Sequence, residues 1–234
     1  MAPEQRECRA SLIEAVPLSP SVRRCVVRAE SELTWEPGQH VELFAAAEPH
    51  VRVPYSIGSA PDAKRPDILE LVIGPGKRQT FVQALEIGAR FMLAGPAGTF
   101  RRPGERPLSA LLVATGTGVA PLRAMVQAWA ARGPRGVQVT LLFGSRNEEE
   151  ILFREEFSEL ARGTPLFRFE PTLSQAGRHW SGRTGRVQEH IEELISALYP
   201  AEAYVCGQIE MVAESVLELG RAGLARAAIF SAGY

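Results

Sequence analysis

The sequence predicts an antiparallel β-barrel or β-sandwich followed by a doubly wound, parallel α/β sheet, and three observations support this fold class. The first hundred residues consist of short apolar or alternating runs that proline and glycine separate, which is typical of antiparallel strands. A charged, proline-rich segment follows at 101–107. After it, strand-like runs alternate with amphipathic helical runs, as they do in parallel sheets. The 234 residues therefore divide into two predicted domains, 1–104 and 105–234.

The first domain is expected to contain six strands and little helix. Apolar or alternating runs bounded by turn-forming residues place strands at 9–16, 22–29, 40–44, 53–58, 68–73 and 90–94. One short segment, 80–85, has helical character. Several short strands of this kind form a barrel or a sandwich.

The second domain is expected to alternate strands and helices. Apolar runs predict strands at 111–114, 137–143, 166–170, 203–206 and 228–230. Apolar residues at helical spacing predict helices at 119–131, at 187–198, at 209–219 and in a segment that starts near Glu148–Glu150. Sheets with this alternation bind ligands at the carboxyl ends of their strands.

Composition excludes several functional classes. The 26 basic and 27 acidic residues nearly cancel, so we expect no nucleic-acid partner. Three scattered cysteines and four histidines show no metal-ligand or disulfide spacing, so we expect no bound metal, and a redox role would require an organic cofactor. Because the sequence also lacks a membrane-spanning segment and a secretion signal, we expect a cytoplasmic location.

A glycine-rich turn follows the first strand of the second domain. Its sequence, at 115–121, is Thr-Gly-Thr-Gly-Val-Ala-Pro. Glycine permits a tight turn and a close ligand approach, and the free amides at the start of the next helix favour a pyrophosphate. The spacing alone fits a tight strand–helix connection without a ligand equally well, since the full dinucleotide fingerprint is absent.

Two further strand ends carry similar turns, at 143–146 and 206–211. Three such turns at the carboxyl edge of one sheet favour a ligand site there. Arg146 can pair with a phosphate or stack on adenine, or it is a solvated residue near the following glutamates. Cys206 fits a buried thiol, and Met211 fits the core better than a binding site.

In the first domain, segment 52–59 places Tyr55 beside Ser56. An aromatic side chain next to a hydroxyl can stack on a flat ring and offer it a hydrogen bond. An ordinary half-buried strand has the same pattern, and the sequence alone favours that reading.

Segment 76–80 joins a strand to the short helical segment. It places Lys77 and Arg78 beside Thr80, a candidate N-cap residue. Two cations at a helix start can hold an anion, and a plain exposed turn is the alternative.

Taken in order, these segments resemble the ferredoxin–NADP reductase-like family of flavoproteins over nearly the whole chain. Family-like motifs occur at 38–39, 54–56, 95–100, 116–121, 143–146, 180–187 and 206–211. Each motif alone is weak, whereas seven in the family's order are specific. The resemblance implies a six-stranded, FAD-binding barrel followed by an NAD(P)-binding domain, with the flavin ring between them.

The resemblance also implies roles for individual residues. Tyr55 would pack on the flavin ring, Ser56 would hydrogen-bond near the flavin N5, and Cys206 would lie beside the nicotinamide, so Ser56 and Cys206 are the implied catalytic residues. Cofactor contacts are implied for Arg52, Pro54, Tyr55, Ser56, Ile57, Lys77, Arg78, Thr80, Gly116, Thr117, Gly118, Arg146, Cys206, Gly207, Met211 and Tyr234.

One departure from the family's pattern concerns the FAD pyrophosphate. The family has an arginine two positions before the tyrosine, where this chain has Val53. Arg52 is one residue away, and neighbouring side chains of a strand point to opposite faces unless the chain bulges. Three alternatives follow: Arg52 is re-aimed, Lys77 and Arg78 replace it, or FAD binds weakly or gives way to FMN.

Two other departures concern the route of the electrons. The chain ends at Tyr234 without the acidic residue found near the terminus of many members, and no cysteine-rich segment accompanies the two domains. We therefore expect the electrons to leave to a separate protein, such as a ferredoxin, a flavodoxin or an oxygenase component. Arg101, Arg102 and Arg106 are candidate contacts for an acidic partner of this kind.

The predicted function is an NAD(P)H-dependent flavin oxidoreductase that passes electrons to such an acceptor. The displaced Arg52 motivates an alternative, a flavin reductase that uses free FMN, FAD or riboflavin as its substrate. The missing terminal carboxylate motivates a third reading, a subunit without turnover. NADH is favoured over NADPH because Glu148–Glu150 would repel a 2′-phosphate near Arg146 and Arg178.

Overall fold

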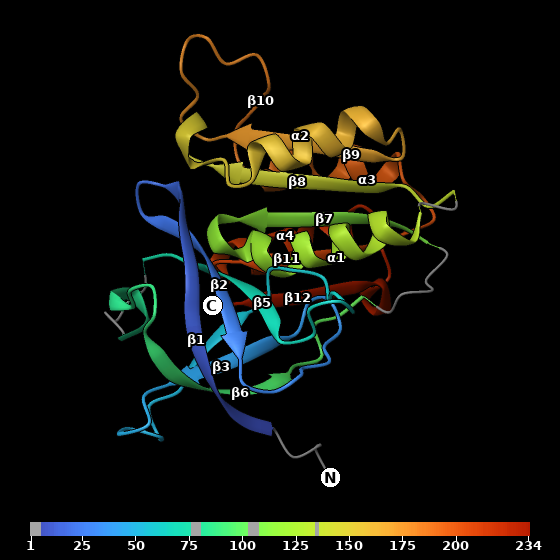
Figure 1. The fold of residues 1–234 in the computed structure, drawn as a ribbon. Coiled ribbons are helices and arrows are strands. Elements are labelled where there is room, and N and C mark those ends of the chain that lie inside the picture. The colour runs from blue at the N-terminus through green and yellow to red at the C-terminus, as the bar shows by residue number, and fades with distance from the viewer. Residues whose placement is uncertain (1–5, 76–80, 103–107, 134–135) are drawn as a thin grey trace.

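The computed structural model of the chain describes residues 6–75, 81–102, 108–133 and 136–234, which fold into two six-stranded sheets (Figure 1). The first sheet is antiparallel and the second is parallel, so the predicted fold class is confirmed. The predicted domain boundary between residues 104 and 105 lies outside the described residues and stays a prediction.

The antiparallel sheet is a barrel. Its strands are β1 (Arg6–Ser19), β2 (Val22–Ala29), β3 (His40–Phe44), β4 (Val53–Ser56), β5 (Ile68–Ile73) and β6 (Arg90–Ala97), in the order β4-β3-β6-β1-β2-β5. The two edge strands meet, because Ile57 bridges Leu71 and the Gly58 amide donates to the carbonyl oxygen of Glu70 at 2.7 Å. Closure of this kind removes the exposed edges of a sheet.

The barrel strands follow the predicted alternation, since one face of each strand fills the barrel core. Strands 22–29, 40–44 and 68–73 have the predicted bounds, whereas β1 and β6 extend beyond the predicted 9–16 and 90–94. Within the predicted helical segment 80–85, the described residues form a single 3₁₀ turn at Phe81–Ala84.

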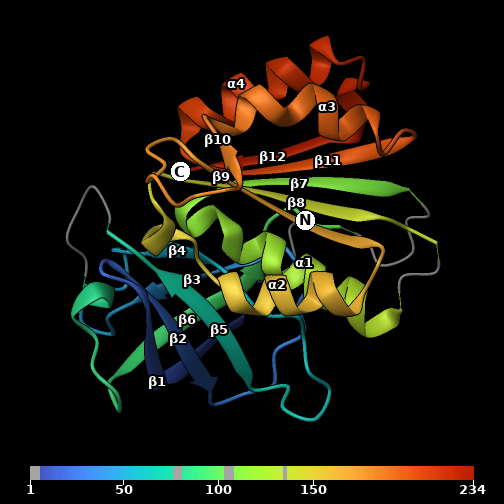
Figure 2. The ribbon, with the colours of Figure 1, turned by 90° about the horizontal axis from the view of Figure 1, so that it is seen from above.

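The parallel sheet has the order β10-β9-β8-β7-β11-β12. Its elements are β7 (Ser109–Thr115), α1 (Val119–Arg132), β8 (Val139–Ser145), α2 (Arg154–Gly163), β9 (Phe167–Leu173), β10 (Arg183–Thr184), α3 (Ile191–Ser196), β11 (Ala201–Gly207), α4 (Ile209–Arg221) and β12 (Ile229–Gly233). Helices α1 and α2 lie between this sheet and the barrel, and α3 and α4 cover the other face (Figure 2). The strand order reverses direction between β7 and β11, the place where such sheets bind ligands.

The predicted helix after β8 begins later than expected. Glu148–Glu150 form a 3₁₀ turn, and α2 starts only at Arg154. Phe153 lies between them in the left-handed conformation, with φ of 56°, which interrupts a continuous helix. The predicted helix 187–198 likewise divides into a 3₁₀ turn, Val187–His190, and α3.

The barrel and the parallel sheet share an apolar interface. Val72 of β5 belongs to the same buried cluster as Leu122 and Met125 of α1. Gly38 lies at this interface with φ of +104°, and an added Cβ would stand 2.2 Å from the carbonyl oxygen of Phe100. Glycine is therefore required at position 38, where the 38–39 motif packs against the backbone that follows β6. Within the described ranges, no helix is long and apolar enough to span a bilayer.

Candidate functional site

The carboxyl ends of β7, β11 and β12 meet at the reversal point of the parallel sheet. A 3₁₀ turn, Gly116–Gly118, follows β7 and leads into α1. Cys206 pairs in register with Ala114 of β7 and with Ala232 of β12. The two predicted glycine turns at 115–121 and 206–211 are thus brought together, and the turn at 143–146 ends the adjacent strand, β8.

Two glycines allow the turn to approach the neighbouring strand. An added Cβ at Gly118 would stand 2.2 Å from the carbonyl oxygen of Cys206, and one at Gly207 would stand 2.5 Å from Thr115 Oγ1. Gly116 differs, because it is exposed with φ of +52° and its Cβ position meets only the Tyr234 hydroxyl, at 3.8 Å. Gly118 and Gly207 therefore serve close packing, and Gly116 forms the open apex of the turn.

Tyr234 lies across this turn. Thr117 donates a hydrogen bond to the Tyr234 hydroxyl at 2.8 Å, and that hydroxyl donates to the Thr115 carbonyl oxygen at 3.3 Å. The Tyr234 backbone amide donates to the Gly207 carbonyl oxygen at 3.2 Å. Partial burial raises the pKa of the Tyr234 phenol above its ordinary value, against the opposing effect of the Thr117 hydrogen bond. The phenol is thus a neutral donor at physiological pH.

Cys206 is a buried, neutral thiol. Its side chain is 2% exposed, and burial raises the pKa of the thiol to about 12. A thiol of this kind is not a nucleophile at neutral pH. Met211 is also buried, and its sulfur accepts a hydrogen bond from Ser215 at 3.3 Å. Both side chains contribute uncharged, buried surface beneath the carboxyl edge of the parallel sheet.

Arg146 is exposed at the end of β8. Its backbone amide donates to a Glu150 carboxylate oxygen at 3.3 Å, and its carbonyl oxygen accepts from the Gln175 amide at 2.8 Å. Within the described ranges its guanidinium makes no ion pair, and neither does that of exposed Arg178. Neither guanidinium is therefore neutralised by a carboxylate of the described residues, and either can pair with an anion.

The donor set at this edge fits a dinucleotide. Gly116 presents open backbone ahead of α1, a helix of 14 residues, and helix starts favour phosphate. Thr115 Oγ1 is buried without a hydrogen-bond partner in the described part of the chain. This hydroxyl carries no signal in the sequence, since its isolation depends on the β7–β11 pairing.

On the barrel, β4 carries the segment that resembles a flavin site. Tyr55 is half-buried against the barrel core, and Ser56 is half-buried with a hydroxyl that makes no hydrogen bond to the described residues. Pro54 is exposed. The Ile57 side chain lies in the core and its amide donates to the Gln39 carbonyl oxygen at 2.9 Å. The Ser56 hydroxyl is therefore available to a ligand.

Arg52 faces carboxylates of the barrel. Its guanidinium lies 2.5 Å from a Glu7 oxygen and 3.6 Å from a Glu42 oxygen, and it sits 4.3 Å above the Phe44 ring. These ion pairs raise the pKa of Arg52 further above its ordinary value. The alternative in which Arg52 is re-aimed toward a pyrophosphate is not what the structure shows. Lys77, Arg78 and Thr80 lie outside the described residues.

Replacing Arg52 by glutamine is expected to leave FAD affinity unchanged within about twofold, because its cationic group is already held by two carboxylates. Fluorescence titration of the apoprotein with FAD measures this affinity. A loss of tenfold or more would contradict the prediction and would return Arg52 to the pyrophosphate site.

The proposed docking arginines are engaged within the chain. Arg102 pairs with the fully buried Glu202 of β11 at 2.9 Å, and Arg101 pairs with Glu36 at 2.5 Å. Arg106 lies outside the described residues. Arg102 is therefore a structural residue and not a free contact for an acidic partner, which corrects the expectation from sequence.

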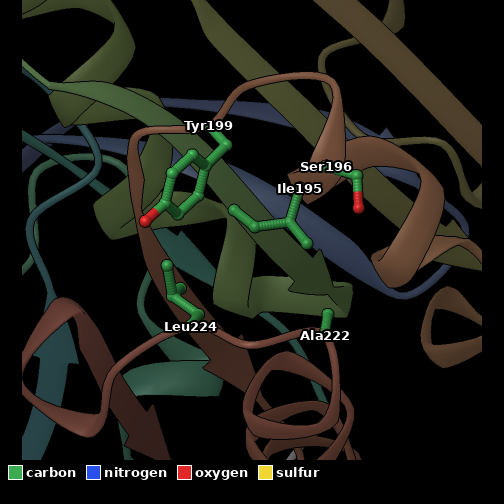
Figure 3. A pocket seen from close by; sticks show the side chains of 5 residues that line it. All are labelled: Ile195, Ser196, Tyr199, Ala222 and Leu224. Atoms are coloured by element: carbon green, nitrogen blue, oxygen red, sulfur yellow. The ribbon is translucent and has the colours of Figure 1, made fainter.

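A surface pocket of about 270 Å³ lies elsewhere, between the ends of α3 and α4 (Figure 3). Ile195, Ser196, Tyr199, Ala222 and Leu224 line it, and the Tyr199 side chain extends over it. Tyr199 lies two residues before the start of β11, so this pocket is at the amino end of the sheet. It is separate from the carboxyl edge that carries the glycine turns.

Comparison with known proteins agrees with this geometry. Residues 112–216 match a family described as "Oxidoreductase NAD-binding domain". The chain is 40% identical to "Ferredoxin--NADP reductase B" of Sorangium cellulosum over 92% of this chain and 91% of that protein. It is 26% identical to "NAD(P)H-flavin reductase" of Vibrio harveyi, over 88% and 87% of the two chains.

Solved structures share the fold. The Amycolatopsis cytochrome P450 reductase GcoB superimposes with a TM-score of 0.87 at 26% identity, covering 98% of this chain and 70% of that one. The shared part includes both the barrel and the parallel sheet.

Proposed function

This chain belongs to the ferredoxin–NADP reductase-like family of oxidoreductases, and we propose that it transfers hydride from NAD(P)H to bound FAD and then passes the electrons to a separate redox protein. The roles of individual residues are part of this proposal. FAD and NAD(P)H are the cofactors of the family to which the chain belongs.

One observation carries the proposal: the barrel and the nucleotide edge meet at a contact. An added Cβ at Gly74, directly after β5, would stand 2.8 Å from Thr117 Cγ2 in the glycine turn. The barrel closes between β4 and β5 through the Ile57–Leu71 bridge. The flavin-like segment of β4 therefore lies one strand from the turn expected to hold the nucleotide.

The bound flavin supplies a ring nitrogen that accepts a hydride, that is, a proton and two electrons. Tyr55 would orient the ring by packing, and the Ser56 hydroxyl, which makes no hydrogen bond to the described residues, would donate one to it. Gly116 admits the dinucleotide to the open turn. The buried, uncharged Cys206 side chain would lie beside the nicotinamide and would exclude water from that side of the site. Tyr234 covers the turn until the nucleotide binds.

We propose that the acceptor is a ferredoxin, a flavodoxin or an oxygenase component. The chain's likeness to a ferredoxin–NADP reductase and to a P450 reductase supports an acceptor of this class. The preference for NADH and the cytoplasmic location stay predictions. The preference for NADH rests on Arg146, whose backbone amide donates to Glu150 beside the place where a 2′-phosphate would bind.

The ion pairs of Arg52 with Glu7 and Glu42 favour a second candidate function, reduction of free flavin. Since its guanidinium is held by Glu7 and Glu42, FAD lacks the arginine that the family pattern provides. A weakly held flavin would act as a substrate, as the name of the Vibrio harveyi relative describes for that protein.

The test consists of three assays, the first of which is the absorption spectrum of the purified protein. FAD is added in excess, free flavin is removed by gel filtration, and the spectrum reports bound flavin. Stopped-flow reduction with NADH and with NADPH follows. The third assay measures cytochrome c reduction with and without a [2Fe–2S] ferredoxin.

We expect a yellow protein, rapid flavin bleaching by at least one nucleotide, and cytochrome c reduction that depends on ferredoxin. A colourless protein that oxidises NAD(P)H only when riboflavin is added would replace the proposal with the second candidate. Bound flavin that neither nucleotide reduces would overturn both.

A further inference from the structure

Arg123 is a buried cation in the first half of α1. Its side chain is 5% exposed. Its Nε donates to both carboxylate oxygens of Glu156, at 2.9 and 2.8 Å, and its Nη1 donates to Glu70 Oε2 at 2.6 Å and to the Gly58 carbonyl oxygen at 2.7 Å. These hydrogen bonds hold the buried Arg123 side chain in one position relative to Glu156, Glu70 and Gly58.

These partners come from both halves of the molecule. Glu156 belongs to α2 of the parallel-sheet half, whereas Glu70 belongs to β5 and Gly58 to the segment after β4, both in the barrel. Glu70 also lies 3.6 Å from Arg24 of β2, so the charges alternate in sign across the interface. The guanidinium of Arg123 is the cation shared between the two carboxylates.

Other residues on the same face of α1 contact the same barrel segment. The Ala60 amide donates to the Gln127 side chain at 3.0 Å, and Gln127 donates in turn to Glu156 at 3.0 Å. Ala120 stands 3.5 Å from the Cβ position of Gly58. Ala120, Arg123 and Gln127 are spaced by three and four residues, which places them on one face of a helix.

This face joins the two parts of the proposed reaction site. Residues 58–60 lie two to four positions beyond Ser56 on the flavin side, and α1 begins directly after the Gly116–Gly118 turn on the nucleotide side. Arg123 is thus one turn of helix from the nucleotide turn and hydrogen-bonded two residues from the flavin segment. Because an α-helix has a fixed rise per residue, α1 fixes the distance between the nucleotide turn and the barrel contact of Arg123.

We propose that Arg123, with Glu70, Glu156 and Gln127, is an interdomain clamp that sets the distance from the nucleotide to the flavin. Arg123 is a positioning residue and touches neither cofactor. The inference rests on the proposed function, because it needs a hydride to pass between the halves. Reacting atoms must approach to about 3–3.5 Å, and a misplacement of about 1 Å costs on the order of 10²-fold in rate.

The chemistry of the clamp predicts what happens when it is opened. Without the Arg123 guanidinium, the carboxylates of Glu70 and Glu156 face each other across the interface, and like charges repel. The barrel segment 58–60 then separates from α1, while each half keeps its own core.

The experiment compares four variants. Arg123→Met opens the clamp, and Glu70→Gln weakens its cross-domain contact while preserving the Glu156 pair. Glu156→Gln weakens the contact within the parallel-sheet half and preserves both barrel contacts. Arg221→Met, in an exposed pair with Glu218 of the same helix, is the matched control. Glu70→Gln keeps the test informative should Arg123→Met fail to fold.

Two sets of measurements are made on each variant. The first is the single-turnover rate of flavin reduction at saturating nucleotide, with its primary deuterium isotope effect. The second uses the apoprotein without either cofactor: hydrogen exchange at the Ala60 amide, and the separate affinities for FAD and for oxidised nucleotide.

We expect Arg123→Met and Glu70→Gln to lose tenfold or more in the reduction rate, with faster exchange at Ala60 and both affinities within about twofold of the parent. Glu156→Gln should lose less, and Arg221→Met nothing. Reduction rates within twofold of the parent in folded Arg123→Met and Glu70→Gln would overturn the clamp, as would unchanged exchange at Ala60. If the parent protein does not reduce flavin, the proposed function fails, and the exchange data still judge the clamp independently.

Discussion

Alanine at position 118 is expected to weaken nucleotide binding while sparing the flavin half. The reason is a collision of backbones, since the new Cβ would stand 2.2 Å from the Cys206 carbonyl oxygen and 2.7 Å from the Gly207 amide nitrogen. Neither atom belongs to a flexible side chain. Gly118 itself has φ of −60° and ψ of −13°, so alanine suits its dihedral angles and the collision alone decides the outcome.

The turn must therefore move away from β11, and this displaces Gly116 and Thr117 from the nucleotide edge. We expect a loss of about 3 kcal/mol in the free energy of unfolding, at the upper end of what overpacking costs. We also expect the KM for NAD(P)H to rise by on the order of 10-fold or more. FAD affinity should not change, because the barrel core contains none of these atoms.

Gly220→Ala is the matched control. Gly220 lies in α4, and its Cβ position has no neighbour within 4 Å, so alanine there should stabilise the protein by about 0.5–1 kcal/mol. Urea unfolding and steady-state kinetics measure both variants. Wild-type KM and stability for Gly118→Ala would show that β11 and the turn are not packed as described.

The elements with a regular pattern were predictable from sequence. Strands 22–29, 40–44 and 68–73 are short apolar runs, and alternate residues of each, such as Cys25 and Val27, belong to the barrel core. The strand–helix alternation after residue 108 likewise predicts a parallel sheet, and this places the glycine turns at 115–121 and 206–211 on one edge. Local periodicity is sufficient for such features because each depends on residues close in sequence.

Features set by distant partners were not predictable. Arg52 is held by Glu7, which is 45 residues earlier, and Arg102 is held by Glu202, which is 100 residues later. The sequence alone therefore wrongly predicted that Arg102 is a contact for an acidic partner. Arg123 left a faint signal, a charged residue inside the apolar run of a predicted helix. Its partners Gly58 and Glu70 could not be inferred, because the relative placement of barrel and helix is a tertiary property.

The same dependence on tertiary contacts explains the break before α2. The glutamates at 148–150 satisfy the usual preference for acid near a helix start. The chain instead places Phe153 in the left-handed region, and the Phe153 ring packs edge-on against Phe157 at 6.2 Å and under the Arg123 guanidinium at 4.4 Å. The aromatic contact overrides the local preference, so the helix starts after it.

The pair between Arg102 and Glu202 is expected to be the largest single electrostatic contribution to stability outside the clamp. Glu202 is fully buried in β11, and Arg102 is 9% exposed; their atoms Nε and Oε1 are 2.9 Å apart. Arg102 also donates to the Leu108 carbonyl oxygen at 2.8 Å. The pair thus ties the residues next to the interdomain segment to the start of the parallel sheet.

Glu202→Gln should lower the free energy of unfolding by about 3–5 kcal/mol, because it leaves the buried Arg102 guanidinium without its anion. The double variant Arg102→Met with Glu202→Leu should recover most of this loss, since an apolar pair replaces two buried charges. Glu36→Gln, which breaks the exposed pair with Arg101, is the control and should cost less than about 1 kcal/mol. Guanidinium chloride unfolding followed by circular dichroism measures all three.

The double variant also tests whether Arg102 stabilises the fold, contacts the redox partner protein, or does both. If Arg102 only stabilises the fold, the folded double variant reduces a ferredoxin with the same dependence on ionic strength as the parent. A flatter dependence on salt would mean that Arg102 meets the partner, because each lost ionic contact reduces that slope. Equal stability of Glu202→Gln and the parent would contradict the burial of the pair. Because Arg102 is held by Glu202, which is buried within β11, we expect the folded double variant to keep the parent's dependence on ionic strength.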